Sequence, residues 1–312
     1  MQRVEQVEAI AQAETEQTAL SANKASSLKI GLALVTLYFI WGSTYLGMRL
    51  AIESFPPFFM AAVRFLIAGS LLYGFLRMRG MSNPTRKQWG SAALVGGLLL
   101  ICGNTGVAFA EQWIDSGLAA VMVATVPLWT ALFAGFWGRW PRRQEWIGSG
   151  LGLIGVILLS TSSRLQLNPL GLIIVLGGAV CWAFGSVWSK HLPMPPGLMA
   201  SAAEMLCAGA ILLIVSLLTG TAAPTGFSLE SVGALIYLII FGSLIAFSAF
   251  SYLIRTVRPT LATSYAYVNP LVAVGLGALL ASEQITWLEV IAMFFVISGV
   301  AFVSLSQRGQ SK

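Results

Sequence analysis

The sequence predicts an all-α membrane protein with ten transmembrane helices, built as two five-helix repeats of opposite orientation. Three observations lead to this fold class: the composition, a series of long apolar runs, and short motifs that recur at a nearly constant spacing. The chain of 312 residues is 57% hydrophobic and only 10% charged, whereas soluble domains carry roughly 25% charged residues. Such a chain cannot form the charged shell that water requires, but its surface suits lipid.

The apolar runs are long enough to cross a bilayer. A helix needs about 20 apolar residues to span roughly 30 Å of hydrocarbon. Eight runs are uncharged, and two carry a single charge each, Arg64 and Glu204. Proline-containing turns such as Pro56-Pro57 and Asn83-Pro84 separate them. The ten predicted spans are 30–48, 56–76, 89–110, 116–138, 146–163, 165–189, 192–218, 231–254, 259–282 and 290–307.

Basic residues predict the orientation of these spans. Fifteen of the eighteen Lys and Arg residues fall on the side of the N-terminus, against Arg49 and Arg164 on the other side and Arg64 within a span. An excess of this kind marks the cytoplasmic side, so both termini are expected there. The predicted divisions are a disordered or weakly helical cytoplasmic tail (1–28), the first repeat (29–164), the second repeat (165–306) and a short cytoplasmic tail (307–312).

Four pairs of motifs indicate an internal repeat. The members of each pair lie 140 to 144 residues apart. They are Trp41-Gly42-Ser43 with Phe184-Gly185-Ser186, Pro56 and Ala68-Gly69 with Pro196 and Ala208-Gly209, Pro127-Leu128 with Pro270-Leu271, and Gly155-Val156 with Gly299-Val300. Each repeat contains an odd number of helices, so the second copy enters the membrane from the opposite side. Inverted repeats of this kind underlie many alternating-access carriers.

The order of several motifs also carries a resemblance to a known group of transporters. The motifs are Trp41-Gly42-Ser43-Thr44, Arg64-Phe65, Pro127, Ala262-Thr263-Ser264-Tyr265-Ala266-Tyr267, Asn269-Pro270 and Glu283. Residues 30–306 resemble the drug/metabolite transporter superfamily, most closely its ten-helix EamA-type branch of bacterial inner-membrane exporters. The resemblance implies export of amino acids, related metabolites or small drugs through a cavity between the two halves. The expected partners are a small-molecule substrate and membrane lipid; no cofactor is expected, and the chain is expected to be a monomer or a homodimer.

Two charged residues within spans are candidate substrate ligands. A charge near the middle of a span costs about 3 kcal/mol even on the lenient insertion scale, so it normally faces the protein interior or water. In the functional interpretation, Arg64 attracts an anionic group such as a carboxylate, and Glu204 binds an amine or a proton. In the structural interpretation, backbone carbonyls, hydroxyls or an ion pair satisfy each charge locally. A direct pair between the two would have to form across the midplane.

Aromatic and amide side chains complete the candidate site. Trp41 and Trp182 lie near mid-span, away from the interfaces where Trp usually concentrates. Aromatic rings with a polar atom suit a cavity that stacks on apolar groups and can hold a cation, although simple packing is the alternative. Buried amides can line a cavity or join helices. The predicted substrate-binding residues are Trp41, Arg64, Asn104, Trp182, Glu204, Tyr265, Tyr267 and Asn269.

Other polar residues are interpreted as structural. Arg49, Glu53, Glu111 and Asp115 cluster at the outer ends of spans and are expected to be solvated rim charges, with an external vestibule as the alternative. Glu283, at the outer end of the ninth span, is also expected to be structural. The Gly148-x-x-x-Gly152 motif predicts close helix packing.

Several other functions are weighed against transport. The net charge of +6 does not indicate nucleic-acid binding, because the basic residues sit in short gaps between apolar runs. An intramembrane hydrolase is disfavoured, since His191 is the single histidine, Asp115 the single aspartate, and no Gly-x-Ser-x-Gly lies near a base. No Walker motif for ATP is present. An uncoupled facilitator and a flippase for lipids or lipid-linked sugars stay open as alternatives.

Overall fold

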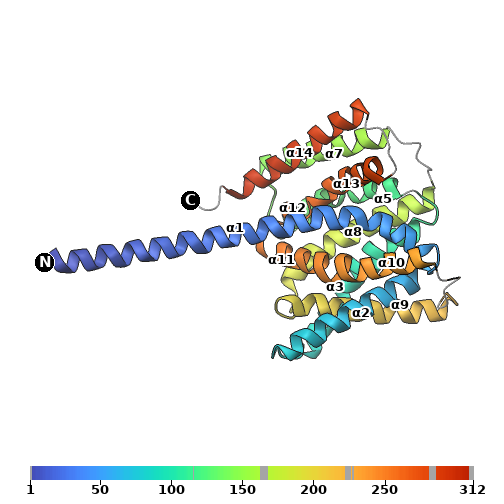
Figure 1. Cartoon of the computed structure of the whole chain (residues 1–312), viewed down its shortest axis with the longest axis horizontal. Helices are drawn as coiled ribbons and strands as arrows, with labels where there is room; N and C mark the ends of the chain where they lie inside the picture. The colour runs from blue at the N-terminus through green and yellow to red at the C-terminus, as the bar shows by residue number, and fades with distance from the viewer. Residues whose placement is uncertain are drawn as a thin grey trace.

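The computed structural model describes residues 2–114, 116–161, 168–221, 226, 228–280 and 286–308, and within these the regular structure is helical. Long helices pack side by side in one bundle, and the N-terminal part of α1 extends beyond it (Figure 1). Residues 2–28, predicted to be a disordered or weakly helical tail, form the first turns of α1.

The elements are α1 Gln2–Ile52, α2 Pro57–Met78, α3 Arg86–Gly96, η1 Gly97–Thr105, α4 Gly106–Ala110, α5 Ser116–Val123, α6 Val126–Phe136, α7 Arg143–Thr161, α8 Pro169–Trp188, η2 Ser189–His191, α9 Leu198–Leu218, α10 Leu229–Tyr237, η3 Leu238–Phe247, α11 Ser248–Thr256, α12 Pro259–Ala262, α13 Tyr265–Leu280 and α14 Trp287–Arg308.

The helices coincide with the apolar runs of the sequence. In the part of the chain that the structure describes, seven helical stretches are long and apolar enough to cross a membrane. They are Ser27–Ile52, Pro57–Met78, Arg86–Ala110, Leu118–Phe136, Pro169–His191, Leu198–Leu218 and Leu229–Thr256. The three other predicted runs lie on α7, on α12 with α13, and on α14. Large apolar side chains such as Phe39, Ile173 and Phe294 are more than 60% exposed, as expected where lipid is the solvent. The chain is therefore a multi-pass membrane protein.

Capping residues set the helix starts. Pro57 stands in the first turn of α2, where its fixed φ suits the helix and its missing N–H costs nothing. At the start of α3, the Thr85 hydroxyl accepts from the Gln88 backbone N–H, and the Gln88 side chain accepts from the Thr85 N–H. Asn168 caps α8 by accepting from the first backbone N–H groups, those of Leu170 and Gly171.

Two pairs of helices cross closely and run antiparallel. A Cβ atom on Gly69 of α2 would meet Leu206 of α9, and one on Gly209 would meet Leu66. Residue numbers rise along α2 as they fall along α9, so the two helices point in opposite directions. The pair α7 and α14 repeats this arrangement, with Gly148 against the Gly299 carbonyl and Gly155 against Val296. Small residues allow the backbones to approach, which confirms the predicted close packing at Gly148.

Two π-helical segments occupy comparable places in the two halves. The segment η1 begins at Gly97 within the third predicted span, and η3 begins at Leu238 within the eighth. Such segments are uncommon and are frequent at functional sites. Both border the centre of the bundle, where η1 packs against α8 and η3 packs against α1.

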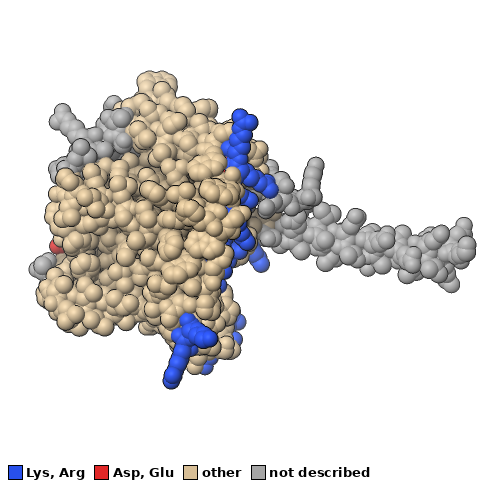
Figure 2. Space-filling model, turned by 180° about the vertical axis from the view of Figure 1, so that it is seen from behind, with Lys and Arg blue, Asp and Glu red and all other residues tan. Residues whose placement is uncertain are grey.

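Most of the described Lys and Arg side chains gather at one end of the bundle (Figure 2). We call this end the basic face. It contains the start of the first span on α1, the connections from α2 to α3 and from α6 to α7, and the C-terminal ends of α8 and α11. The basic residues of these segments are Lys29, Arg77, Arg79, Arg86, Lys87, Arg139, Arg142, Arg143, Lys190, Arg255 and Arg258. The opposite face carries the end of α1 and the start of α2, with Arg49 and Glu53. This distribution follows the asymmetry of charge that the sequence predicted.

Candidate substrate pocket

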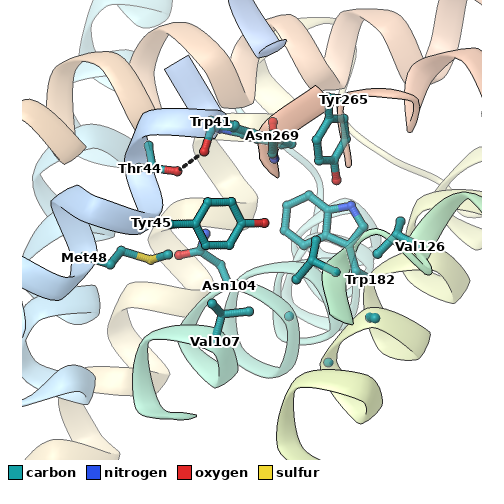
Figure 3. A pocket seen from close by; sticks show the side chains of 14 residues that line it. Trp41, Thr44, Tyr45, Met48, Asn104, Val107, Val126, Trp182, Tyr265 and Asn269 are labelled. Atoms are coloured by element: carbon teal, nitrogen blue, oxygen red, sulfur yellow. Dashed lines mark hydrogen bonds between the residues drawn. The ribbon is translucent and has the colours of Figure 1, made fainter. Parts of the chain in front are cut away.

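A pocket lies at the centre of the bundle, among α1, η1, α4, α8 and α13 (Figure 3). Five of the eight predicted site residues line it: Trp41, Asn104, Trp182, Tyr265 and Asn269. Tyr45 and Met48 extend its wall along α1 toward the opposite face. The pocket has a volume of about 50 Å³, room for a few water molecules when each needs at least ~10–15 Å³. A solute as large as an amino acid requires the surrounding helices to separate.

Aromatic rings close the end of the pocket nearer the basic face. The Trp41 ring lies edge to face against Trp182 and Tyr265, with centroid distances of 5.4 and 4.6 Å. Phe250 of α11 packs 5.3 Å from each indole. Trp41 precedes Tyr45 and Met48 on α1, which runs from the basic face to the opposite face, so this cluster forms the inner end of the pocket.

Two polar atoms in the pocket wall lack well-formed hydrogen bonds. Trp41 donates through Nε1 to the Gly242 carbonyl at 3.2 Å. In contrast, the buried Nε1 of Trp182 and Oδ1 of Asn269 form no hydrogen bond of normal geometry within the described chain, and they interact only with the hydroxyls of Tyr265 and Tyr45, respectively. Buried polar atoms are normally paired in good geometry, so a poorly paired donor and a poorly paired acceptor in one pocket indicate a place for a ligand with both kinds of group.

Arg64 does not line the pocket, but it contacts Asn104, which does. It is 2% exposed, donates through Nε to the Ser243 hydroxyl at 2.8 Å, and donates through Nη1 to Asn104 Oδ1 at 3.2 Å. Its charge is thus satisfied by a hydroxyl and an amide, as the structural interpretation expected, and no carboxylate among the described residues pairs with it. Arg64 reaches the pocket only through Asn104.

Glu204 and Tyr267, also predicted to bind substrate, lie away from the pocket. The backbone carbonyl of Glu204 packs against Gly96 of α3, and Arg255 is the cation that acts on its carboxyl group. Arg64 and Glu204 therefore form no direct pair. Tyr267 belongs to a separate cluster, where its ring covers Gly152 of α7. Substrate contact by these two residues stays a prediction.

The rim charges at the opposite face differ in their exposure. Arg49 and Glu53 are exposed, as predicted. Glu111, however, is 0% exposed, so the prediction of a solvated charge is wrong for this residue. Glu111 follows α4, and its backbone carbonyl accepts from Arg49 of α1. Asp115 and Glu283 lie outside the described residues.

A second cavity, of about 530 Å³, opens on the basic face, and we call it the basic cavity. Arg139, Lys190, Arg255 and Arg258 line it. Arg258 is paired with Glu145, with Nη2 and Oε2 3.0 Å apart. Over the described ranges the other three have no carboxylate within ion-pair distance, which leaves an excess of positive charge around the cavity. The sequence did not predict this site, since its residues follow three different spans.

Comparisons with known proteins agree with this architecture. The chain is 48% identical to "Uncharacterized inner membrane transporter YedA" of Escherichia coli (strain K12) over 279 residues, which cover 88% of this chain and 90% of that protein. It is 26% identical to "Uncharacterized transporter sll0355" of Synechocystis sp., with 92% of each chain covered. A solved structure described only as "Crystal structure of protein" superposes with a TM-score of 0.75 at 20% identity. It covers 91% of this chain and 99% of its own, and supports the fold.

The sequence profile described as the EamA-like transporter family matches the chain twice, over residues 28–161 and over residues 169–305. The two matches cover most of the chain, and the relatives of similar length are transporters by name. The chain belongs to the EamA-like transporter family, within the drug/metabolite transporter superfamily.

Proposed function

We propose that the protein is a secondary transporter that exports amino acids, related small metabolites or small drugs across the bacterial inner membrane by alternating access. The observation that carries this proposal is the central pocket. Trp182 offers an N–H and Asn269 a carbonyl oxygen that form no hydrogen bond of normal geometry and interact only with tyrosine hydroxyls of the pocket, within an otherwise largely apolar wall. This combination suits a small amphipathic solute, whose polar groups pair with the two atoms while its apolar part stacks on the rings.

The architecture of the transporter is ten spans in two inverted repeats. One family profile matches both halves, and η1 and η3 stand at comparable places within them. The corresponding helices α2 and α9 are antiparallel neighbours, as are α7 and α14. Inversion between the halves accounts for this antiparallel pairing and provides two conformations that open opposite faces.

The direction of transport is from the basic face outward. Positive charge marks the cytoplasmic side, so both termini are placed in the cytoplasm. Arg139, Lys190 and Arg255 make the basic cavity attractive to a carboxylate arriving from that side. The cluster of Trp41, Trp182 and Phe250 then separates the basic cavity from the central pocket and has to part during each cycle.

Transport from loaded proteoliposomes tests the proposal. Efflux of radiolabelled amino acids, one at a time, is compared for the parent protein, Trp182→Phe and Trp287→Phe. Trp182→Phe keeps an aromatic ring but removes the poorly paired donor, whereas Trp287 is 82% exposed and serves as the control. We expect slower efflux only for Trp182→Phe. Equal efflux from liposomes with and without the protein, for every amino acid, contradicts the substrate class.

The same vesicles separate the alternatives. A facilitator equilibrates the solute and never accumulates it, whatever gradient is imposed. A flippase moves a labelled lipid between leaflets and leaves amino acids in place. Accumulation of an amino acid against its own gradient supports the exporter over both.

A further inference from the structure

Glu111 is a buried carboxyl group that the pocket does not use. It follows α4, its side chain is 0% exposed, and neither carboxyl oxygen has a hydrogen-bond partner in the described parts of the chain. The neighbouring cation does not satisfy it. Arg49 of α1 donates through Nη1 to the backbone carbonyl of Glu111, not to the carboxyl group. A carboxyl group that is fully buried and unpaired is rare in a folded protein and calls for a specific explanation.

Two titratable side chains, both on α1, interact electrostatically with Glu111. They are Arg49 and Tyr45. The facing turns of α2 (57–63) and α8 (169–180) contain no titratable residue. Glu53, at the same end, is exposed to solvent. Arg49 is therefore the one nearby charge in the described chain that can favour ionisation of the Glu111 carboxyl group.

Aromatic rings shield this end of the bundle. Phe58 of α2 stacks on Phe109, and Trp113 meets Phe109 edge to face. Water is thereby kept from the Glu111 side chain in this conformation.

The chemistry of such a site favours the neutral acid. An ionised carboxylate without water or hydrogen bonds is strongly disfavoured, and the group normally takes up a proton instead. Burial raises the pKa of the Glu111 carboxyl well above its usual range, and the charge of Arg49 opposes this shift only in part. Separation of α1 from α4 would admit water, allow ionisation, and leave Arg49 in place to pair with the carboxylate.

We propose that Glu111 is a proton-binding site that takes up a proton when the end of the pocket at the opposite face closes, and releases it to water when that end opens. The proposal rests on the alternating-access function above. Glu111 is one helical turn from Val107, to whose carbonyl its backbone N–H donates at 3.0 Å, and Val107 and Tyr45 both line the pocket. The proton is therefore bound beside the substrate space, at the helices that must separate to open it.

Two readouts on the full chain in lipid nanodiscs test this proposal without any substrate. The first is the infrared carbonyl-stretch band of a protonated carboxylic acid, recorded at neutral pH and through a titration. The variants are Glu111→Gln, Glu111→Met, Glu204→Gln and the exposed control Glu53→Gln. Glu204 is a second buried carboxyl group, so its contribution to the band is identified as the part that Glu204→Gln removes. We expect a separate Glu111 component that persists in Glu53→Gln and Glu204→Gln, is lost from both Glu111 variants, and disappears at alkaline pH. Glu111→Met keeps the side-chain volume without a buried polar group, so it retains the fold if the amide of Glu111→Gln does not.

The second readout is opening at the opposite face. In a Met48→Cys protein, a membrane-impermeant thiol reagent labels the pocket when that face opens, and peptide mapping separates the introduced thiol from the native Cys102, Cys181 and Cys207. Labelling of the introduced thiol should rise as the pH rises through the titration of the band. Addition of Glu111→Gln, a permanently neutral side chain, should hold labelling low at every pH.

An unchanged acid band in Glu111→Gln, or labelling that follows pH equally with and without Glu111, overturns the proposal. Neither readout uses a transported solute, so a wrong substrate class leaves both results intact. Conversely, amino-acid efflux that is independent of Glu111 leaves the exporter assignment standing.

Discussion

The indole rings of Trp41 and Trp182 meet edge to face at the centre of the bundle, 5.4 Å apart, yet only the N–H of Trp41 forms a hydrogen bond of normal geometry. Trp41 comes from α1 and Trp182 from α8, the first helices of the two halves. Trp41 donates to the Gly242 carbonyl, while the Trp182 donor is poorly aligned and interacts only with the Tyr265 hydroxyl within the pocket. The pair therefore combines a fixed ring with a ring that is available to a ligand.

This difference predicts unequal effects on stability. Trp41→Phe removes the partner of a buried carbonyl, which costs about 1–3 kcal/mol. Trp182→Phe removes a donor that forms no hydrogen bond of normal geometry, so it should cost less than Trp41→Phe. Thermal unfolding of the two purified variants in the same detergent measures the contrast. Equal shifts of the unfolding midpoint would contradict it.

Gly242 gives room to the Arg64 guanidinium. A Cβ atom at this position would lie 2.8 Å from Arg64 Nη2, so Gly242→Ala should displace Arg64 from Ser243 and Asn104. Overpacking of this kind costs about 1–3 kcal/mol, and transport should fall as the Asn104 wall loses its support. Gly233→Ala, on α10 with nothing within 4 Å, is the matched control. Transport assays and unfolding midpoints are compared, and equal behaviour of the two variants would remove Gly242 from the site.

The contact between α2 and α9 predicts a second contrast between glycines. A Cβ atom on Gly69 would lie 3.0 Å from the backbone nitrogen of Leu206, whereas Gly74 has open space. Gly69→Ala should therefore destabilise the protein by about 1–3 kcal/mol. Gly74→Ala should leave it unchanged or stabilise it by up to ~1 kcal/mol, because Ala favours helix. Unfolding midpoints that shift in the same direction would contradict the close crossing.

Much of the fold and part of the site followed from the sequence because they depend on local patterns. Apolar runs predicted the helices, and the mid-span position of Trp41 and Trp182 pointed to the pocket. The partners of charged residues depend on contacts between distant helices, which hydropathy does not encode. Arg64 meets Ser243 across 179 residues, and Glu204 lies near Arg255.

Burial at helix ends was the hardest feature to foresee. Glu53 and Glu111 both flank the opposite face, and a sequence pattern treats them alike. Only the packing of the helices in three dimensions buries Glu111 and leaves Glu53 exposed. The sequence likewise does not distinguish Tyr265 from Tyr267. Tyr265 lines the pocket, whereas Tyr267 faces Gly152.

The positive charge around the basic cavity predicts that Arg139 and Lys190 act when the substrate binds, not in the conformational change. Arg139→Gln and Lys190→Gln reduce the positive potential at the entrance without changing the central pocket. We expect a higher KM for a carboxylate solute with little change in kcat, and a smaller loss at high salt, where the parent is screened as well. Arg79→Gln, exposed on the same face but outside the cavity, is the control. A reduction of kcat with KM unchanged would place these residues in the conformational step instead.

Burial of Glu111 also predicts how stability depends on pH. Its pKa in the folded protein is raised from the ordinary value of 4.5 by desolvation, with Arg49 opposing the shift. Below that ordinary value both the folded and the unfolded chain hold the proton, so the residue adds no pH dependence to stability. As the pH rises above it, the unfolded chain loses its proton first, so the folded state is progressively disfavoured. The slope approaches about 1.4 kcal/mol per pH unit until the folded pKa is reached.

Unfolding midpoints measured from acid to alkaline pH should thus fall more steeply for the parent and Glu53→Gln than for Glu111→Gln, because glutamine does not titrate. Parallel curves for all three proteins would mean that Glu111 is ionised in the folded state, and would remove the basis for a proton at this site.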